Sequence, residues 1–206
     1  LTILCLVLLS VHSYSQDVVT GPFLIRDGVI YDQNTNEPVT GIIETFNENG
    51  QLRERGIFRD GKQDGPSEQY HENGQLWAKG NYKDGEKDRP WKRFYDNGQL
   101  WAKGNYNNGW RDDLWEYYYE NGQLWERGIY INGRREGSHV EFHRNGQLKR
   151  KGGWKDGKKD GLHEVYHENG QLWTREYIKD GKQVKKFLAL KSEQVVERGG
   201  ITYQIN

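Results

Sequence analysis

Several residue types are scarce in this chain, and each scarcity excludes a class of protein. Cys5 is the only cysteine, so the chain cannot form an internal disulfide or a paired-cysteine redox site. Lysine plus arginine and aspartate plus glutamate number 30 each, which leaves no excess of positive charge to attract polyanions. The composition therefore argues against a nucleic-acid partner and makes membrane attachment an unfavoured interpretation.

The sequence also lacks the short motifs of common active sites. It contains no Gly-x-Ser-x-Gly elbow, no Gly-x-x-x-x-Gly-Lys phosphate loop and no zinc motif. Two histidine pairs, His139 with His143 and His163 with His167, are each four residues apart. Four residues of strand span about 13 Å, too far for two imidazoles to share one zinc ion. We therefore expect no metal, no cofactor and no enzymatic activity, and we interpret these histidines as substitutes for aromatic residues.

The most regular feature present is a repeated tetrapeptide. Asn-Gly-Gln-Leu occurs six times at intervals of 24 residues, starting at Asn49, Asn73, Asn97, Asn121, Asn145 and Asn169. A second Asp-Gly or Asn-Gly pair keeps the same period, at residues 60–61, 84–85, 108–109, 132–133, 156–157 and 180–181. Both pairs tolerate the positive φ angles of type I′ turns, which join antiparallel strands. Each unit is therefore predicted to be one β-hairpin that continues into the next.

Alternation of side chains within a unit excludes helix and predicts two-sided strands. Leu100, Ala102, Gly104 and Tyr106 are spaced by two, so we expect them to share one side of a strand. The glycine leaves space there for a neighbouring ring. The predicted fold is all-β, an elongated single-layer array of antiparallel β-hairpin repeats in which each unit contacts only its neighbours.

The ends of the chain differ from the repeats. Leu1 to Ser10 are almost entirely apolar, and the small residues Ser13 and Ser15 follow. This pattern predicts that residues 1–15 are the remnant of a secretory signal peptide, with a buried first strand as the alternative. We then expect an N-terminal cap at residues 16–41, six repeats at residues 42–185 and a C-terminal cap at residues 186–206.

The unit resembles a known family. From Tyr70 to Asp88, Tyr-x-Glu-Asn-Gly-Gln-Leu is followed by Lys-Gly-x-Tyr-x-Asp-Gly-x-Lys-Asp, and Tyr166 to Gly181 follows the same pattern in part. These residues resemble the MORN-repeat variant, in particular the bacterial YwqK-type toxin-antitoxin antitoxins. The resemblance implies a hairpin array that binds other molecules, with a toxin as the family's partner. Arg89 and Asp113 stand where the motif has glycine, so we expect the backbone to differ locally there.

The candidate binding residues are aromatic. A column opposite the leucines carries four tryptophans, and rings on the adjacent strands join it if those strands face the same way. The candidate face consists of Trp77, Trp101, Trp125, Trp173, Trp91, Trp115, Tyr95 and Tyr119. Such rings suit peptide side chains or glycan rings. The alternative is that these rings cover a second small core.

These features lead to two functional hypotheses. The first is a non-enzymatic repeat scaffold for protein–protein interaction, with a protein as the partner. The second is an exported protein that binds a cell-envelope glycan through the tryptophan column. The apolar N-terminal segment predicts export to the periplasm, the cell surface or the medium, and a cytoplasmic location follows if that segment is not a signal.

Overall fold

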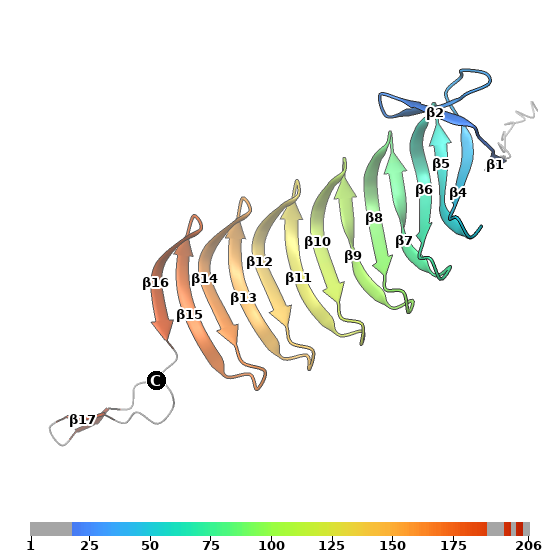
Figure 1. The fold of residues 1–206 in the computed structure, drawn as a ribbon. Helices are drawn as coiled ribbons and strands as arrows, with labels where there is room; N and C mark the ends of the chain where they lie inside the picture. The colour runs from blue at the N-terminus through green and yellow to red at the C-terminus, as the bar shows by residue number, and fades with distance from the viewer. Residues whose placement is uncertain (1–17, 189–195, 199–200, 204–206) are drawn as a thin grey trace, which may run out of the picture.

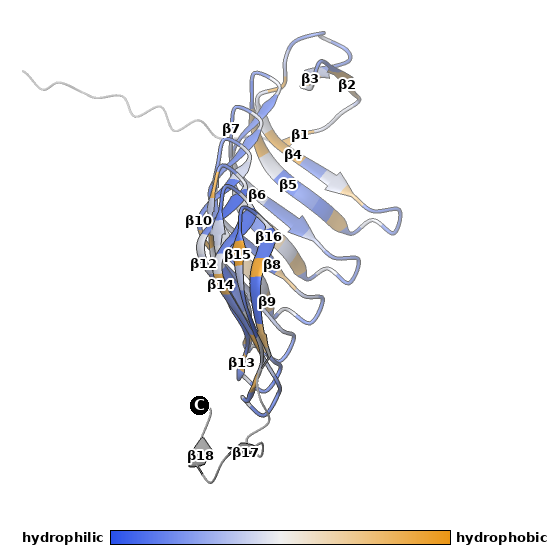
Figure 2. Cartoon of the chain, turned by 90° about the vertical axis from the view of Figure 1, so that its left-hand side faces the viewer, coloured by the Kyte–Doolittle hydropathy of each residue, from blue (hydrophilic) through white to orange (hydrophobic). Residues whose placement is uncertain are grey.

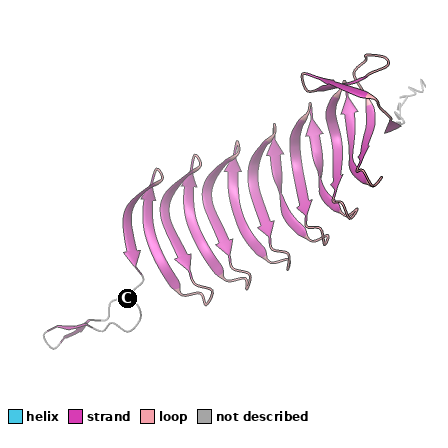
Figure 3. Ribbon diagram, viewed as in Figure 1, coloured by secondary structure: helices cyan, strands magenta, loops and turns pink. Residues whose placement is uncertain are grey.

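The fold is dominated by one long sheet of consecutive hairpins (Figures 1 and 3). The computed structural model describes residues 18–188, 196–198 and 201–203. The strands are β1 (Val18–Val19), β2 (Phe23–Arg26), β3 (Val29–Asp32), β4 (Gly41–Phe46), β5 (Leu52–Arg59), β6 (Lys62–Tyr70), β7 (Leu76–Lys83), β8 (Glu86–Phe94), β9 (Leu100–Asn107), β10 (Trp110–Tyr118), β11 (Leu124–Ile131), β12 (Arg134–Phe142), β13 (Leu148–Lys155), β14 (Lys158–Tyr166), β15 (Leu172–Lys179), β16 (Lys182–Leu188), β17 (Val196–Arg198) and β18 (Ile201–Tyr203). No helix in this part of the chain is long and apolar enough to cross a membrane.

The strand order confirms the predicted array. The main sheet has 14 strands, in which β4 to β16 lie side by side in sequence order and pair antiparallel. Viewed from the side, they form one curved layer (Figure 2). Because every strand from β5 to β15 pairs only with the strands before and after it in the chain, the array is held together by contacts between neighbouring units.

The Asp-Gly and Asn-Gly turns form as predicted. Their first residues have φ between 46° and 51°, and the following glycines have φ between 75° and 90°, which are the angles of a type I′ turn. Each turn also bonds to the preceding unit. The amide of Gly85 donates to the carbonyl of Gln63 at 2.9 Å, and that of Gly109 donates to Lys87 at 2.9 Å. These turns therefore both reverse the chain and tie adjacent hairpins together.

The turns of the Asn-Gly-Gln-Leu motif differ from the prediction. Asn97 has no positive φ, whereas Gly98 has φ 83°. The amide of Gly98 donates to the carbonyl of Tyr95 at 2.9 Å, and that of Tyr95 donates to Gln99 at 2.8 Å. This is a type I turn followed by a left-handed glycine, a longer loop than the predicted type I′ turn. The side chain of Asn97 accepts from the amide of Gln99 at 2.9 Å, which explains the asparagine.

A β-bulge after this turn corrects the predicted facing of the leucines. Phe94 pairs with Leu100 and Arg93 pairs with Ala102, so Trp101 is an extra residue in its strand. The bulge turns the strand over between Leu100 and Ala102. Leu100 therefore lies on the opposite face from Ala102, Gly104 and Tyr106, and the expectation that all four share one side was wrong.

A second irregularity lies in the even-numbered strands. Asp112 pairs with Asn105 and Glu116 with Lys103, so the three residues between Asp112 and Glu116 face one residue of β9. The equivalent residue of every unit has positive φ, from 61° at Arg89 and 62° at Asp113 to 143° at Gly41. Arg89 and Asp113 thus keep the left-handed bend that Gly137 has at φ 63°. The expectation that the backbone differs at these two residues was therefore wrong: the backbone follows the same course, and the two non-glycine residues adopt a strained positive φ.

The first repeat is joined by an N-terminal segment. β1 pairs in parallel with β4, and the hairpin of β2 and β3 lies beside the end of β5 (Figure 1). The amide of Ile30 donates to the carbonyl of Gly61 at 2.8 Å, and that of Val39 donates to Ile30 at 3.0 Å. At the other end, β17 pairs with β18 in a separate small sheet. The predicted signal remnant at residues 1–15 lies outside the described residues, as does much of the predicted C-terminal cap.

The left-handed residues yield a stability prediction. Arg89→Gly should raise the free energy of unfolding by about 0.5–1 kcal/mol, because a left-handed non-glycine residue costs more than the chain entropy that glycine adds. Asp113→Gly should give a smaller gain, since aspartate tolerates this conformation better than arginine does. Urea denaturation measures both. Gly137→Arg is the reverse control and should destabilise; stabilisation by that change, or destabilisation by Arg89→Gly, would contradict the assignment.

Candidate binding face

The two faces of the sheet carry different chemistry. We call the face with Ala102, Gly104 and Tyr106 the tryptophan face, and the face with Leu100 and Phe94 the leucine face. Trp101 and Trp125 pack against the buried cluster of the tryptophan face, which contains Ala102 and Trp115. The tryptophan column therefore lies opposite the leucines, as predicted, but it shares its face with the glycine and tyrosine columns.

Two of the predicted site residues belong to the core. Trp91 and Trp115 are each only 1% exposed. A Cβ atom at Gly104 would collide with the indole of Trp115, and one at Gly80 would collide with that of Trp91, so each ring lies directly over a glycine of the preceding strand. Each indole N–H donates to a backbone carbonyl, Trp91 to Asn81 at 3.0 Å and Trp115 to Asn105 at 2.9 Å. Trp91 and Trp115 hold neighbouring strands together and cannot contact a partner.

Tyrosines and cations fill the space between these rings. Trp91 packs edge to face against Tyr82 at 5.3 Å and Tyr106 at 6.1 Å between centroids, and Tyr106 continues to Trp115 at 5.0 Å. Lys87 lies 4.4 Å from the centroid of Trp91, and Arg111 lies above Trp115 at 5.1 Å. Burial is the main cause that lowers the pKa of Lys87. The column of basic residues was not identified from the sequence, although Lys87, Arg111 and Arg135 recur every 24 residues.

Histidines replace the buried tryptophans in the later units. Nε2 of His139 bonds to the carbonyl of Ile129 at 2.9 Å, and Nε2 of His163 bonds to Gly153 at 2.8 Å. Because a carbonyl can only accept, each Nε2 carries the proton and does what the indole N–H does in earlier units. Both rings lie over glycines, Gly128 and Gly152. The interpretation of these histidines as aromatic substitutes is confirmed.

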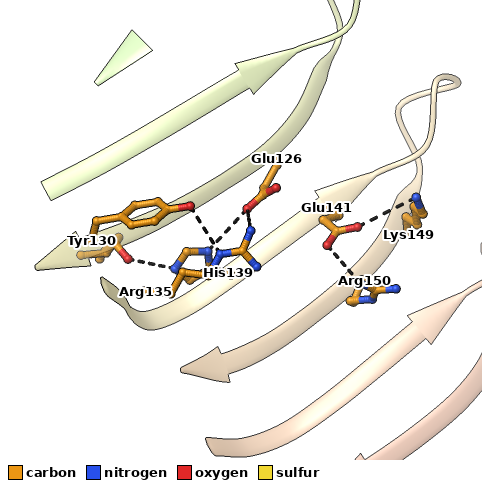
Figure 4. A network of polar contacts seen from close by, with 8 residues as sticks. Glu126, Tyr130, Arg135, His139, Glu141, Lys149 and Arg150 are labelled. Atoms are coloured by element: carbon orange, nitrogen blue, oxygen red, sulfur yellow. Dashed lines mark hydrogen bonds and ion pairs between the residues drawn. The ribbon is translucent and has the colours of Figure 1, made fainter. Parts of the chain in front are cut away.

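A carboxylate is buried beside His139. Glu126 is 6% exposed, and Arg135 donates to it at 2.7 Å, while Nδ1 of His139 lies 3.8 Å away (Figure 4). Burial favours a higher pKa for Glu126, but the nearby His139 and the charge of Arg135 outweigh it and lower the pKa. Arg135 also reaches the hydroxyl of Tyr130 at 3.4 Å. The network compensates the buried charge of Glu126 and closes the core between the fourth and fifth units.

The remaining predicted aromatics form a row of pairs along one edge. We call these the rim pairs, since one ring precedes and the other follows each Asn-Gly-Gln-Leu turn, at the same edge of the sheet. They are His71 with Trp77, Tyr95 with Trp101, Tyr119 with Trp125, and His167 with Trp173, with centroid separations of 6.5, 6.4, 6.1 and 5.7 Å. Trp77 is 40% exposed and Trp173 is 60% exposed. The structure thus brings six of the eight predicted residues to the rim.

Hydrogen bonds between units fix the tyrosines of the rim. The hydroxyl of Tyr95 donates to the carbonyl of Tyr118 at 2.8 Å, and that of Tyr119 donates to Phe142 at 2.8 Å. His71 makes the equivalent contact to Phe94 at 3.0 Å. Three of the four rim pairs therefore contain a ring that is hydrogen-bonded to the next hairpin, which holds these pairs in a fixed order before any partner arrives.

The fifth unit breaks the row. Lys149 takes the place of tryptophan and Arg150 that of the small residue, and both lie near Glu141, at 3.9 and 3.1 Å (Figure 4). His143 occupies the position of the paired ring and bonds to the carbonyl of Tyr166 at 3.0 Å. Two cations facing one carboxylate leave a local excess of positive charge. The rim position of tryptophan is thus aromatic in four units and basic in two, the fifth and the first, where it is Arg53.

The leucine face is stabilised by a different repeated contact. The hydroxyls of Tyr70, Tyr118 and Tyr166 donate to Glu68, Glu116 and Glu164 at 2.9, 3.0 and 2.8 Å. Lys103 pairs with Glu116 at 2.8 Å, and this hydrogen bond is the main cause that lowers the pKa of Glu116. Directly opposed charges of this kind stabilise paired strands. Within the part of the chain that the structure describes, this face has no row of clustered rings comparable to the rim.

Comparison with known proteins agrees with this geometry. The family described as the MORN repeat variant matches residues 39–60, 63–84, 90–108, 114–132, 135–156 and 159–180. The six matches together cover more than half of the chain, and each contains one Asn-Gly-Gln-Leu turn and ends at the first residue of the following Asp-Gly or Asn-Gly pair. No curated protein matches the chain.

The contact between ring and glycine yields a prediction. Gly104→Ala should lower the free energy of unfolding by about 1–3 kcal/mol, the usual cost of overpacking, because the added methyl group collides with Trp115. In a Trp115→Ser background, which copies Ser67 of the second unit, the same change should cost less than about 0.5 kcal/mol, since alanine is the better strand residue once the ring is gone. Urea denaturation of the four proteins measures the coupling. Equal costs in both backgrounds would show that the ring does not rest on Gly104.

Proposed function

Because the chain belongs to the MORN repeat variant family, we propose that it is a non-enzymatic scaffold that binds a protein along the rim of its tryptophan face. MORN repeats commonly mediate protein or membrane-lipid interactions. The observation that carries the proposal is the row of rim pairs, which leaves Trp77 and Trp173 substantially exposed on a rigid sheet. Exposed tryptophan and tyrosine are the residues most enriched at the energetic centres of protein interfaces.

The balance of charge favours a protein over a lipid surface. Lysine and arginine equal aspartate and glutamate in number, and the loops that border the rim carry acidic residues in five of six units. These are Glu48, Glu72, Asp96, Glu120 and Glu168, with Arg144 in the fifth unit. Acidic loops repel the anionic lipids that attract basic peripheral proteins. A protein with a mixed or basic surface is the better complement.

The location of the protein bears on the identity of that partner. We propose export, on the basis of the apolar segment Leu1 to Ser10 and the small residues that follow it. Export favours a partner in the cell envelope or outside the cell. The resemblance to YwqK-type antitoxins implies a toxin as the partner. That partner would require the protein to be in the cytosol, and it is one specific case of the protein-binding function.

A cell-envelope glycan is the second candidate ligand. Exposed aromatic rings in a row provide apolar surfaces on which sugar rings can stack. The four tryptophans of the rim support this candidate as they support the first. The experiment below separates the two ligand classes.

The proposal predicts that the rim selects peptides. When a random peptide library is panned on the full chain, peptides retained by the wild type should bind Trp77→Ala plus Trp101→Ala at least about tenfold more weakly, a loss of about 1.4 kcal/mol. Trp110→Ala is the matched control, because Trp110 is 63% exposed but lies at the opposite end of the strands. Equal binding by the double variant would exclude the rim. Retention on insoluble envelope polysaccharide that disappears in the double variant, without peptide binding, would favour the glycan.

A further inference from the structure

The spacing of the rim pairs matches one particular peptide conformation. Successive pairs are two strands apart, which places them about 9.6 Å from one another at the usual spacing of about 4.8 Å per strand. A polyproline II helix turns once every three residues and rises about 3.1 Å per residue, or about 9.3 Å per turn. We propose that the rim binds a proline-rich segment in this conformation, one turn per hairpin. This inference rests on the proposed protein-binding function and specifies its ligand.

Other peptide conformations fit the rim less well. In an extended strand, residues on one side recur every two positions, at about 6.6 or 13 Å, and neither distance matches the spacing of the pairs. In an α-helix one side recurs about every seven residues, at about 10.5 Å, so the mismatch reaches about 1.8 Å between Trp77 and Trp125. For polyproline II the same mismatch is about 0.6 Å. Side-chain rotation can absorb the smaller error.

The rings of each pair are inclined toward one another. The interplanar angles are 63° for His71 with Trp77, 56° for Tyr95 with Trp101, 41° for Tyr119 with Trp125 and 38° for His167 with Trp173. Inclined rings present two apolar surfaces at an angle to one another and not one flat platform. Proline-rich segments dock between aromatic side chains in this way. A flat sugar ring stacks best on a single open ring face, which the tilt of each partner ring restricts.

The hydrogen-bonding groups of the rim complement the same ligand. The indole N–H groups of Trp77, Trp101, Trp125 and Trp173 have no acceptor among the described residues, in contrast to those of Trp91 and Trp115. Tryptophan can only donate, and a proline-rich backbone in polyproline II offers free carbonyls but few N–H groups. Each rim tryptophan thus supplies one donor for one ligand carbonyl.

The fifth unit sets the register of the ligand. The positions that follow Trp77, Trp101 and Trp125 along the row are Lys149 and then Trp173. Lys149 and Arg150 outnumber their partner Glu141, so the ligand residue at this step should be acidic. The inferred ligand has a proline at every third residue, three in all, and an acidic residue three positions after the last proline. Because polyproline II ligands bind in either chain direction, the order is Pro-x-x-Pro-x-x-Pro-x-x-Glu or its reverse.

Fluorescence anisotropy on the full chain with labelled ten-residue peptides tests the inference. One peptide has proline at positions 1, 4 and 7 and glutamate at position 10, a second has the reverse order, and a control has the same composition with proline at every second position. One ordered peptide should bind at least about tenfold more tightly than the control. Trp101→Phe, which keeps a ring but removes the N–H donor, should weaken that binding about 3- to 10-fold, the usual value of one hydrogen bond. Trp110→Ala should leave it unchanged.

A charge exchange tests the register. Lys149→Glu should weaken binding of the glutamate peptide and strengthen binding of the same peptide with lysine at position 10, whereas a purely structural role of Lys149 would affect both peptides alike.

Far-UV circular dichroism confirms that each variant keeps its sheet, and Trp77→Ala replaces Trp101→Phe if the latter unfolds. No preference for the period of three, together with library peptides that lack proline but depend on Trp77 and Trp101, would overturn this inference and leave the protein-binding function standing. Binding of soluble envelope oligosaccharide that Trp101→Phe abolishes, without peptide binding, would overturn both.

Discussion

The contact on which the rest of the structure depends is a large ring lying over a glycine of the neighbouring strand. A single layer has no second sheet or helix to cover it, so its apolar side chains must shelter one another within one face. Trp91 and Trp115 achieve this by lying across Gly80 and Gly104 while their N–H groups donate to backbone carbonyls. The left-handed residue that precedes each ring by two positions lets the strand bend far enough for this contact. Glycine is therefore required in the column of Gly80 and Gly104, where a ring needs the space, and favoured in the column of Gly137, where the backbone has a positive φ.

This arrangement explains why the same type of residue is core in one column and surface in another. Trp115 follows the bend in an even-numbered strand and is buried, whereas Trp101 follows a turn as the extra residue of a bulge and reaches the rim. The buried column tolerates histidine, because His139 and His163 reproduce both the ring and the N–H donor. The rim column accepts Lys149, because its side chain can remain in water. The buried column keeps a ring with an N–H donor in four successive units, whereas the rim column changes from aromatic to basic, as expected of a surface that distinguishes ligands.

The sequence predicts the period, the hairpins, the type I′ turns at residues such as Asn108-Gly109 and the neighbour-only sheet, because each follows from local backbone preferences of glycine, asparagine and aspartate. It predicts the wrong type for the turns of the Asn-Gly-Gln-Leu motif. It does not predict the faces correctly. A single bulged residue at Trp101 reverses the alternation, so simple counting by two placed Leu100 on the wrong side. The sequence also does not show that Trp91 is buried while Trp77 is exposed. Burial of Trp91 depends on the left-handed bend at Arg89, and arginine at a position where other units have glycine hides that bend in the sequence. The cation column at Lys87, Arg111 and Arg135 has a clear 24-residue period, and that signal was present in the sequence.

Deletion of one complete unit tests most directly the claim that rings and glycines of adjacent hairpins hold the array together. Removing residues 90–113 keeps the period and the turns but removes Trp91, Gly104 and one interface between units. In a nearest-neighbour array the shortened protein should remain a β-sheet by circular dichroism and unfold cooperatively at a lower urea concentration, because one unit and one interface no longer contribute. An unchanged unfolding midpoint and slope would contradict the account, since the deleted ring and glycine would then contribute nothing to stability.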